Sequence, residues 1–95
     1  MLSKIPIDLK NIKKEDLDKE ILRAGIIAEY DAINLYEQMA SLAQDENLKK
    51  VLLDVAKEEK EHVGEFQTLL LQRDKELGEE MEEGKEEVEE LTGGE

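Results

Sequence analysis

The sequence predicts an all-α fold, an antiparallel hairpin of two long helices. Two stretches carry apolar side chains at alternating steps of three and four residues, the spacing that keeps one stripe of a helix against a partner. No proline interrupts either stretch. The connection between them is short, which favours antiparallel neighbours.

The first helix is expected to begin near Glu15 or Asp16, where acidic side chains suit the helix dipole, and to end at about Ala43. Its apolar stripe is formed by Leu22, Ile26, Glu29, Ile33, Tyr36, Ala40 and Ala43. Residues 1–14, which include Pro6, are expected to form an extended N-terminal arm.

The second helix is expected to follow a turn at Gln44–Asp45, with Asp45 as its N-cap, and to run to about Leu77 or Gly78. Its stripe is formed by Leu52, Val55, Glu59, His62, Phe66, Leu69, Arg73 and Leu77. Residues 15–78 are therefore the predicted helical hairpin. Dense glutamate and several glycines in residues 79–95 favour an acidic flexible tail or linker over a stable helix.

The composition excludes several classes of function. The net charge of −13 argues against nucleic acid as a partner, because phosphates would be repelled. The absence of cysteine excludes disulfides, thiolate metal sites and iron–sulfur clusters. No apolar run is long enough for a signal peptide or a membrane span, so a cytoplasmic location is expected. The chain has only one phenylalanine, two tyrosines and no tryptophan, so it can bury little apolar surface by itself. This favours assembly with other copies.

Glu29, Glu59 and His62 occupy stripe positions where a hairpin needs apolar side chains. A charge there is costly unless it is paired or bound to a metal. Glu29 lies about fifteen residues before the turn, so it should face position 60 of the returning helix, between Glu59 and His62. Considered separately, the position of His62 indicates a hydrogen-bonded core residue and that of Glu59 indicates a surface residue. The agreement of three positions favours a metal site.

Glu59 and His62 form a Glu-x-x-His motif, which places a carboxylate and an imidazole on one helical face. Di-iron and di-manganese sites in helix bundles need a Glu from each of two helices and a Glu-x-x-His from each of two others. One chain supplies half of this set, and a dimer would supply all of it. The ligand types suit iron or manganese, although other divalent metals such as zinc could bind. Tyr36, two turns after Glu29, could hydrogen-bond near the metals or pack in the core.

The chain resembles the encapsulated ferritins over roughly Asp16 to Leu77. The resemblance rests on the segment Glu29-Tyr30-Asp31-Ala32-Ile33-Asn34-Leu35-Tyr36-Glu37 and on the segment Glu58-Glu59-Lys60-Glu61-His62. It implies that two chains dimerise into a ferritin-like four-helix bundle, with two iron ions at the dimer interface held by Glu29, Glu59 and His62 and with Tyr36 nearby. It also implies a ring of dimers such as a decamer.

The same resemblance implies a ferroxidase that oxidises Fe(II) to Fe(III) with oxygen and feeds iron storage inside a cytoplasmic encapsulin nanocompartment. Some relatives end in an apolar peptide that docks in the shell, and residues 79–95 do not resemble one. Other relatives are fused to the shell protein, so we expect residues 79–95 to be such a linker. Two alternatives are a di-iron or di-manganese peroxidase or catalase, and a structural oligomerisation module held together by metal.

Overall fold

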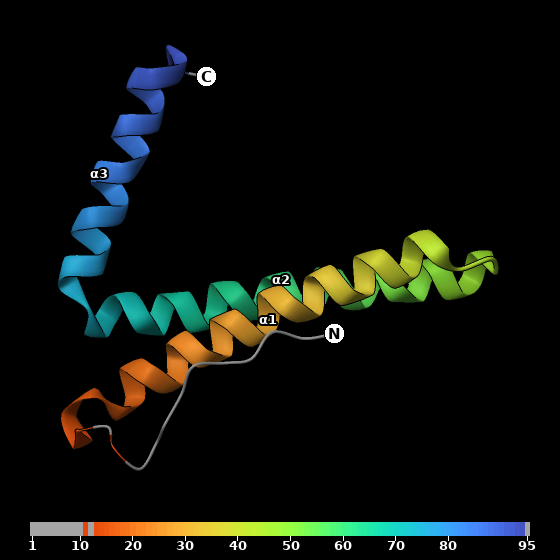
Figure 1. Cartoon of the computed structure of the whole chain (residues 1–95), viewed down its shortest axis with the longest axis horizontal. Helices are drawn as coiled ribbons and strands as arrows, with labels where there is room; N and C mark the ends of the chain where they lie inside the picture. Colours follow the sequence, from red (N-terminus) through yellow and green to blue (C-terminus); the bar gives the residue numbers. More distant parts are fainter. Residues whose placement is uncertain (1–10, 12, 95) are drawn as a thin grey trace.

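The computed structural model describes residues 11 and 13–94, and it is helical almost throughout. A 3₁₀ turn, η1 (Lys14–Asp16), leads into α1 (Leu17–Leu42), which is followed by α2 (Glu46–Arg73) and α3 (Lys75–Thr92) (Figure 1). No strand occurs in this described part of the chain, which confirms the all-α prediction. Most of the expected N-terminal arm, residues 1–10 and 12, lies outside the described residues, and Lys14 already belongs to η1.

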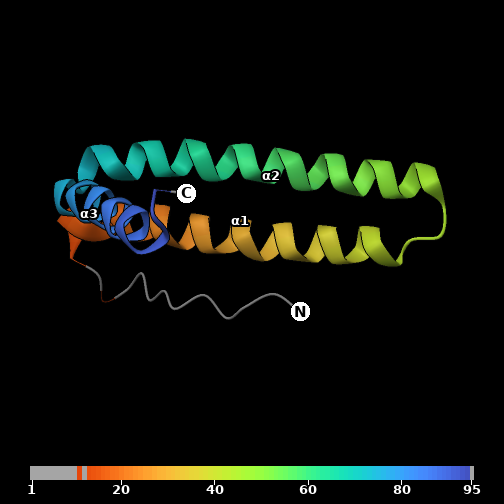
Figure 2. The same cartoon turned by 90° about the horizontal axis from the view of Figure 1, so that it is seen from above.

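Helices α1 and α2 lie side by side and run antiparallel, joined by a short turn at residues 43–45 (Figure 2). Asp45 begins α2 as predicted, because its Oδ2 accepts a hydrogen bond from the Leu48 backbone N–H at 2.8 Å. The sequence thus predicted both the turn and its cap correctly. None of the described helices is long and apolar enough to cross a membrane.

The core between α1 and α2 is small and lies where the two helices touch. Its buried apolar side chains are Leu22, Ile33, Ala40, Ala56 and Leu70. The first three belong to the stripe predicted for the first helix. The stripe predicted for the second helix is correct only in part. It omits the buried Ala56 and Leu70 and includes Leu69, which is 47% exposed, whereas its members His62 and Phe66 are half-buried against α1. The face of α2 that meets α1 therefore includes Ala56 and Leu70 as well as the predicted positions His62 and Phe66.

Asp74 ends α2 earlier than the sequence predicted. Its backbone leaves the helical region (φ −133°, ψ 86°), and α2 stops at Arg73 instead of Leu77 or Gly78. Asp74 Oδ1 accepts a hydrogen bond from the Leu77 N–H at 3.0 Å, and its Oδ2 accepts one from Arg23 Nη2 at 3.1 Å. An aspartate that bonds neighbouring backbone groups in this way caps a new helix instead of continuing the old one.

The expectation that residues 79–95 are flexible is wrong for residues 79–92, which are helical. Glutamate, lysine and methionine are good helix formers, Asp74 caps the first turn, and Gly93 ends the helix in the left-handed conformation (φ 77°). These local preferences outweigh the repulsion between like charges. Helix α3 leaves the hairpin at the end opposite the turn and points away from it (Figures 1 and 2). A linker role for this helix stays a prediction.

Candidate metal centre

The structure brings Glu29, Glu59 and His62 together, as the sequence predicted. Helix α1 supplies Glu29, and α2 supplies the other two side chains from successive turns of one face. His62 Nδ1 lies 3.4 Å from Glu29 Oε1 and 3.6 Å from Glu59 Oε2. One ligand atom from each of the three residues lies within 4.8 Å of the others, so the group could hold a metal ion.

The three residues perturb one another electrostatically. Burial raises the pKa of Glu29 above its ordinary value, and the nearby Glu59 carboxylate raises it further while His62 opposes the shift. Burial acts to lower the pKa of His62, but the carboxylates of Glu29 and Glu59 outweigh this effect and raise it. Without a bound cation, Glu29 and His62 therefore bind protons more tightly in the cluster than they would as isolated side chains.

Glu29 gives the strongest indication that a cation fits this cluster. Its side chain is only 16% exposed, and its Oε2 atom is buried without a hydrogen-bond partner among the described residues. A buried carboxylate oxygen with no donor is costly, and a bound cation would offset that cost. Carboxylate and imidazole together are suitable ligands for iron, manganese or zinc.

His62 is the most open member of the cluster, with 44% of its side chain exposed. It lies on a stripe of α2 whose members recur every seven residues. We call this the heptad stripe; it consists of Leu48, Val55, His62 and Leu69. Leu48 and Leu69 are about half exposed (50% and 47%), so α1 leaves part of the stripe uncovered. One side of the cluster therefore opens onto an uncovered apolar surface.

Tyr36 is half-buried on α1, two turns beyond Glu29. It makes no hydrogen bond with the three cluster residues in the described part of the chain. Its predicted role beside the metal therefore stays a prediction.

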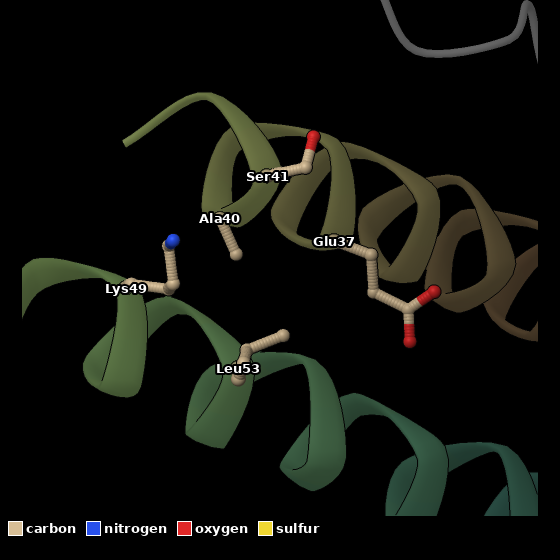
Figure 3. Close-up of a pocket in the computed structure, with 5 residues that line it drawn as sticks. All are labelled: Glu37, Ala40, Ser41, Lys49 and Leu53. Carbon is tan, nitrogen blue, oxygen red and sulfur yellow. The ribbon is translucent and has the colours of Figure 1, made fainter. Parts of the chain in front are cut away.

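A separate pocket of about 250 Å³ lies between α1 and α2 near the turn, lined by Glu37, Ala40, Ser41, Lys49 and Leu53 (Figure 3). None of the cluster residues lines it. The Glu37 carboxylate is already paired with Lys60 Nζ at 2.8 Å, and Lys49 Nζ lies 3.8 Å from Glu46. The pocket therefore offers no set of free ligands comparable to the cluster.

Gly25 and Phe66 make a close contact one helical turn from the cluster, which the sequence pattern did not predict. A carbon placed at the Cβ position of Gly25 would lie 3.3 Å from the Phe66 ring. An isolated glycine inside a helical pattern is the signal that could have indicated this close approach.

Comparisons with known proteins agree with this fold. The sequence model of the family described as "Rubrerythrin" matches residues 20–92. The crystal structure of the encapsulated ferritin domain from Pyrococcus furiosus superposes with a TM-score of 0.83 and 56% identity, covering 98% of this chain and 97% of that one. The chain belongs to the encapsulated ferritins, within the rubrerythrin family.

A second relative of this encapsulated ferritin is a longer protein. The chain is 63% identical over 84 residues to the ferritin-like-encapsulin shell fusion protein of Pyrococcus furiosus. This match covers 88% of the chain but only 24% of the relative, so the chain spans about a quarter of that protein's length. The resemblance drawn from the sequence is thereby confirmed.

Proposed function

We propose that this encapsulated ferritin is a ferroxidase, which oxidises Fe(II) to Fe(III) with oxygen at a site built by two copies of the chain. The observation that carries the proposal is the cluster of Glu29, Glu59 and His62, with a buried Glu29 oxygen that lacks a donor in the described structure. In this proposal the iron ions are the substrate, and each gives one electron to oxygen.

A second copy would complete the ligand set. One cluster contains one Glu from α1 and one Glu-x-x-His from α2, which is half of the set found in di-iron helix bundles. A twofold axis beside the cluster would bring the same residues from a partner, since such an interface uses one surface twice. The heptad stripe supports this arrangement, because its exposed leucines flank His62 on the face that the partner would cover.

The chain's own residues would contribute binding and charge. Two copies would place four carboxylates around two ions, and this negative charge favours Fe(III) over Fe(II). His62 binds a metal only as the neutral imidazole, so its raised pKa makes binding release a proton and weaken at acid pH. The ligands project from the helices α1 and α2 and not from loops, so the side chains need little rearrangement to bind metal.

The proposal also includes a partner for this chain, an encapsulin shell protein. The fusion relative joins a ferritin-like part to an encapsulin shell. We infer that this chain acts inside such a shell in the cytoplasm, and that residues 79–95 lead toward the shell protein. Rings of dimers, such as decamers, would be the working assembly.

Two other functions use the same cluster. A di-iron or di-manganese peroxidase or catalase would consume hydrogen peroxide faster than oxygen. A structural module would use the metal only to join subunits, and no oxygen-dependent turnover would then occur.

The test is to add Fe(II) to the anaerobic protein, admit air, and follow Fe(III) formation and oxygen uptake. We expect oxidation well above the protein-free rate, and a fall close to that rate in His62→Ala. A matched control is Glu61→Ala, which changes an exposed neighbour of His62 outside the cluster and should oxidise iron like the unaltered protein. Equal rates with the unaltered protein and without any protein would refute the ferroxidase.

A further inference from the structure

Helices α1 and α2 approach each other closely where Gly25 faces Phe66. A Cβ atom on Gly25 would lie 3.3 Å from both Cδ2 and Cε2 of the Phe66 ring, closer than an ordinary van der Waals contact. Both residues are half-buried. With a Cβ atom at position 25 this contact would be unusually tight, and the ring would have to shift by a few tenths of an ångström.

This contact lies on the same side of the hairpin as the metal cluster and one turn away from it. Gly25 precedes Glu29 by four residues and Phe66 follows His62 by four, so each pair shares a helical face. Because the helices run antiparallel, the two steps go in the same direction in space. Further along this side, Arg73 Nη1 lies 3.7 Å from Asp18 Oδ2.

The cluster depends on the spacing between the two helices. Glu29 comes from α1, whereas His62 comes from α2, and Glu29 Oε1 lies 3.4 Å from His62 Nδ1. A small outward movement of α1 would separate the ligand atoms before it disturbed either helix. The packing one turn away is therefore well placed to set the distance between the ligands.

Glycine at position 25 weakens the helix compared with alanine, so its presence needs a reason. Gly64, in the middle of α2, provides a comparison because a Cβ atom there would meet nothing within 4 Å. The two glycines therefore carry the same cost for the helix, but only Gly25 makes room for a neighbouring side chain.

We propose that the Gly25–Phe66 contact is a positioning contact that sets the spacing of α1 and α2 so that Glu29 and His62 can hold the same metal ion. The inference rests on the proposed metal site, but it adds two residues that do not touch the metal. Phe66 positions α2 against Gly25 of α1, and this spacing sets the positions of the ligands one turn away.

The test measures anaerobic Co(II) binding by visible absorption, with helical content followed by circular dichroism. In Gly25→Ala the added methyl group pushes against the ring, and we expect Co(II) affinity to fall by about tenfold or more, as when outer support of a ligand is lost. Helical content should stay the same. The matched control is Gly64→Ala, the same chemical change in open space, which should bind Co(II) like the unaltered protein.

Two further variants make the test independent of how well Gly25→Ala folds. Phe66→Leu alone should also weaken Co(II) binding, since a smaller side chain leaves the helix spacing undefined. The double variant with Gly25→Ala and Phe66→Leu should bind more tightly than Gly25→Ala, because the smaller side chain relieves the contact.

The outcomes separate this inference from the proposed function. Unaltered affinity in Gly25→Ala or in Phe66→Leu, or an equal loss in Gly64→Ala, overturns the positioning role and leaves the metal site intact. If the unaltered protein binds no Co(II), or binds it as tightly after His62→Ala, the metal site fails and the positioning role falls with it.

Discussion

Glu29 is the residue at which function and stability are most clearly opposed. Its side chain is largely buried, and burial together with the Glu59 carboxylate raises its pKa. A raised pKa in the folded state means that folding favours the protonated form, so stability from this group is lost as the pH rises through the folded pKa. At neutral pH the ionised carboxylate is therefore unfavourable unless a cation is bound.

We expect Glu29→Gln to stabilise the metal-free protein while it removes metal binding. Glutamine has a similar shape without the buried charge, so thermal unfolding of the metal-free variant at pH 7 should occur at a higher temperature. Co(II) affinity should fall by more than about a hundredfold, beyond the usual cost of losing an outer-shell partner. A variant that is less stable without metal would show that Glu29 stabilises the fold by itself.

At the scale of the helices, the junction at Asp74 decides where α2 ends and how α3 begins. The hydrogen bond from the Leu77 N–H lowers the pKa of Asp74, burial opposes this effect, and the hydrogen bond from Arg23 lowers it further. A lowered pKa means that this group stabilises the fold above its ordinary pKa of 3.8 and that the contribution is lost as the pH falls through the folded value.

The Leu77 amide should report this titration directly. In an NMR pH series on the metal-free protein, we expect its chemical shift to change with a midpoint below 3.8. The change should be absent in Asp74→Asn, which can still cap α3, and the midpoint should move upward in Arg23→Ala. A midpoint at or above the ordinary value in the unaltered protein would be inconsistent with the cap and ion pair described here.

The sequence predicted the hairpin well because its signals were local. Apolar spacing identified α1 and α2, and Asp45 identified the turn. Helix α3 was not predicted, because the repulsion among its glutamates opposes a helix that their helix propensity and the cap at Asp74 nevertheless stabilise. The buried Ala56 of α2 was not predicted, because alanine is a weak hydrophobic signal beside Val55.

The cluster was predictable for a related reason. Glu29, Glu59 and His62 are polar residues in apolar stripes, and counting from the turn placed them at one height. The Gly25–Phe66 contact was not predictable in this way, because it depends on the distance between the two helices and not on spacing within either one.

At the scale of the whole molecule, the hairpin has a small core and leaves large apolar side chains exposed. Five apolar side chains are buried in the described structure, while the leucines of the heptad stripe stay exposed. A partner on this stripe would cover them and bring a second cluster beside the first. If metal binds only to the dimer, metal and partner must each strengthen the binding of the other.

Leu69→Glu tests this dependence without touching a ligand. A charge at this end of the heptad stripe, which the partner would cover, should dissociate the dimer in sedimentation experiments and weaken metal binding, although Glu29, Glu59 and His62 are unchanged. The control is Leu42→Glu, a leucine that is 80% exposed beside the turn and lies outside the stripe, and it should leave both properties intact. A monomeric Leu69→Glu that binds metal normally would show that one chain is sufficient.

The most direct test of the proposed shared site is native mass spectrometry of the anaerobic protein titrated with Fe(II). Our account predicts that iron appears in pairs on dimers and larger even-numbered assemblies, and that monomers in the same spectrum carry none. Monomers that carry iron at the same occupancy per chain as the dimers would contradict it.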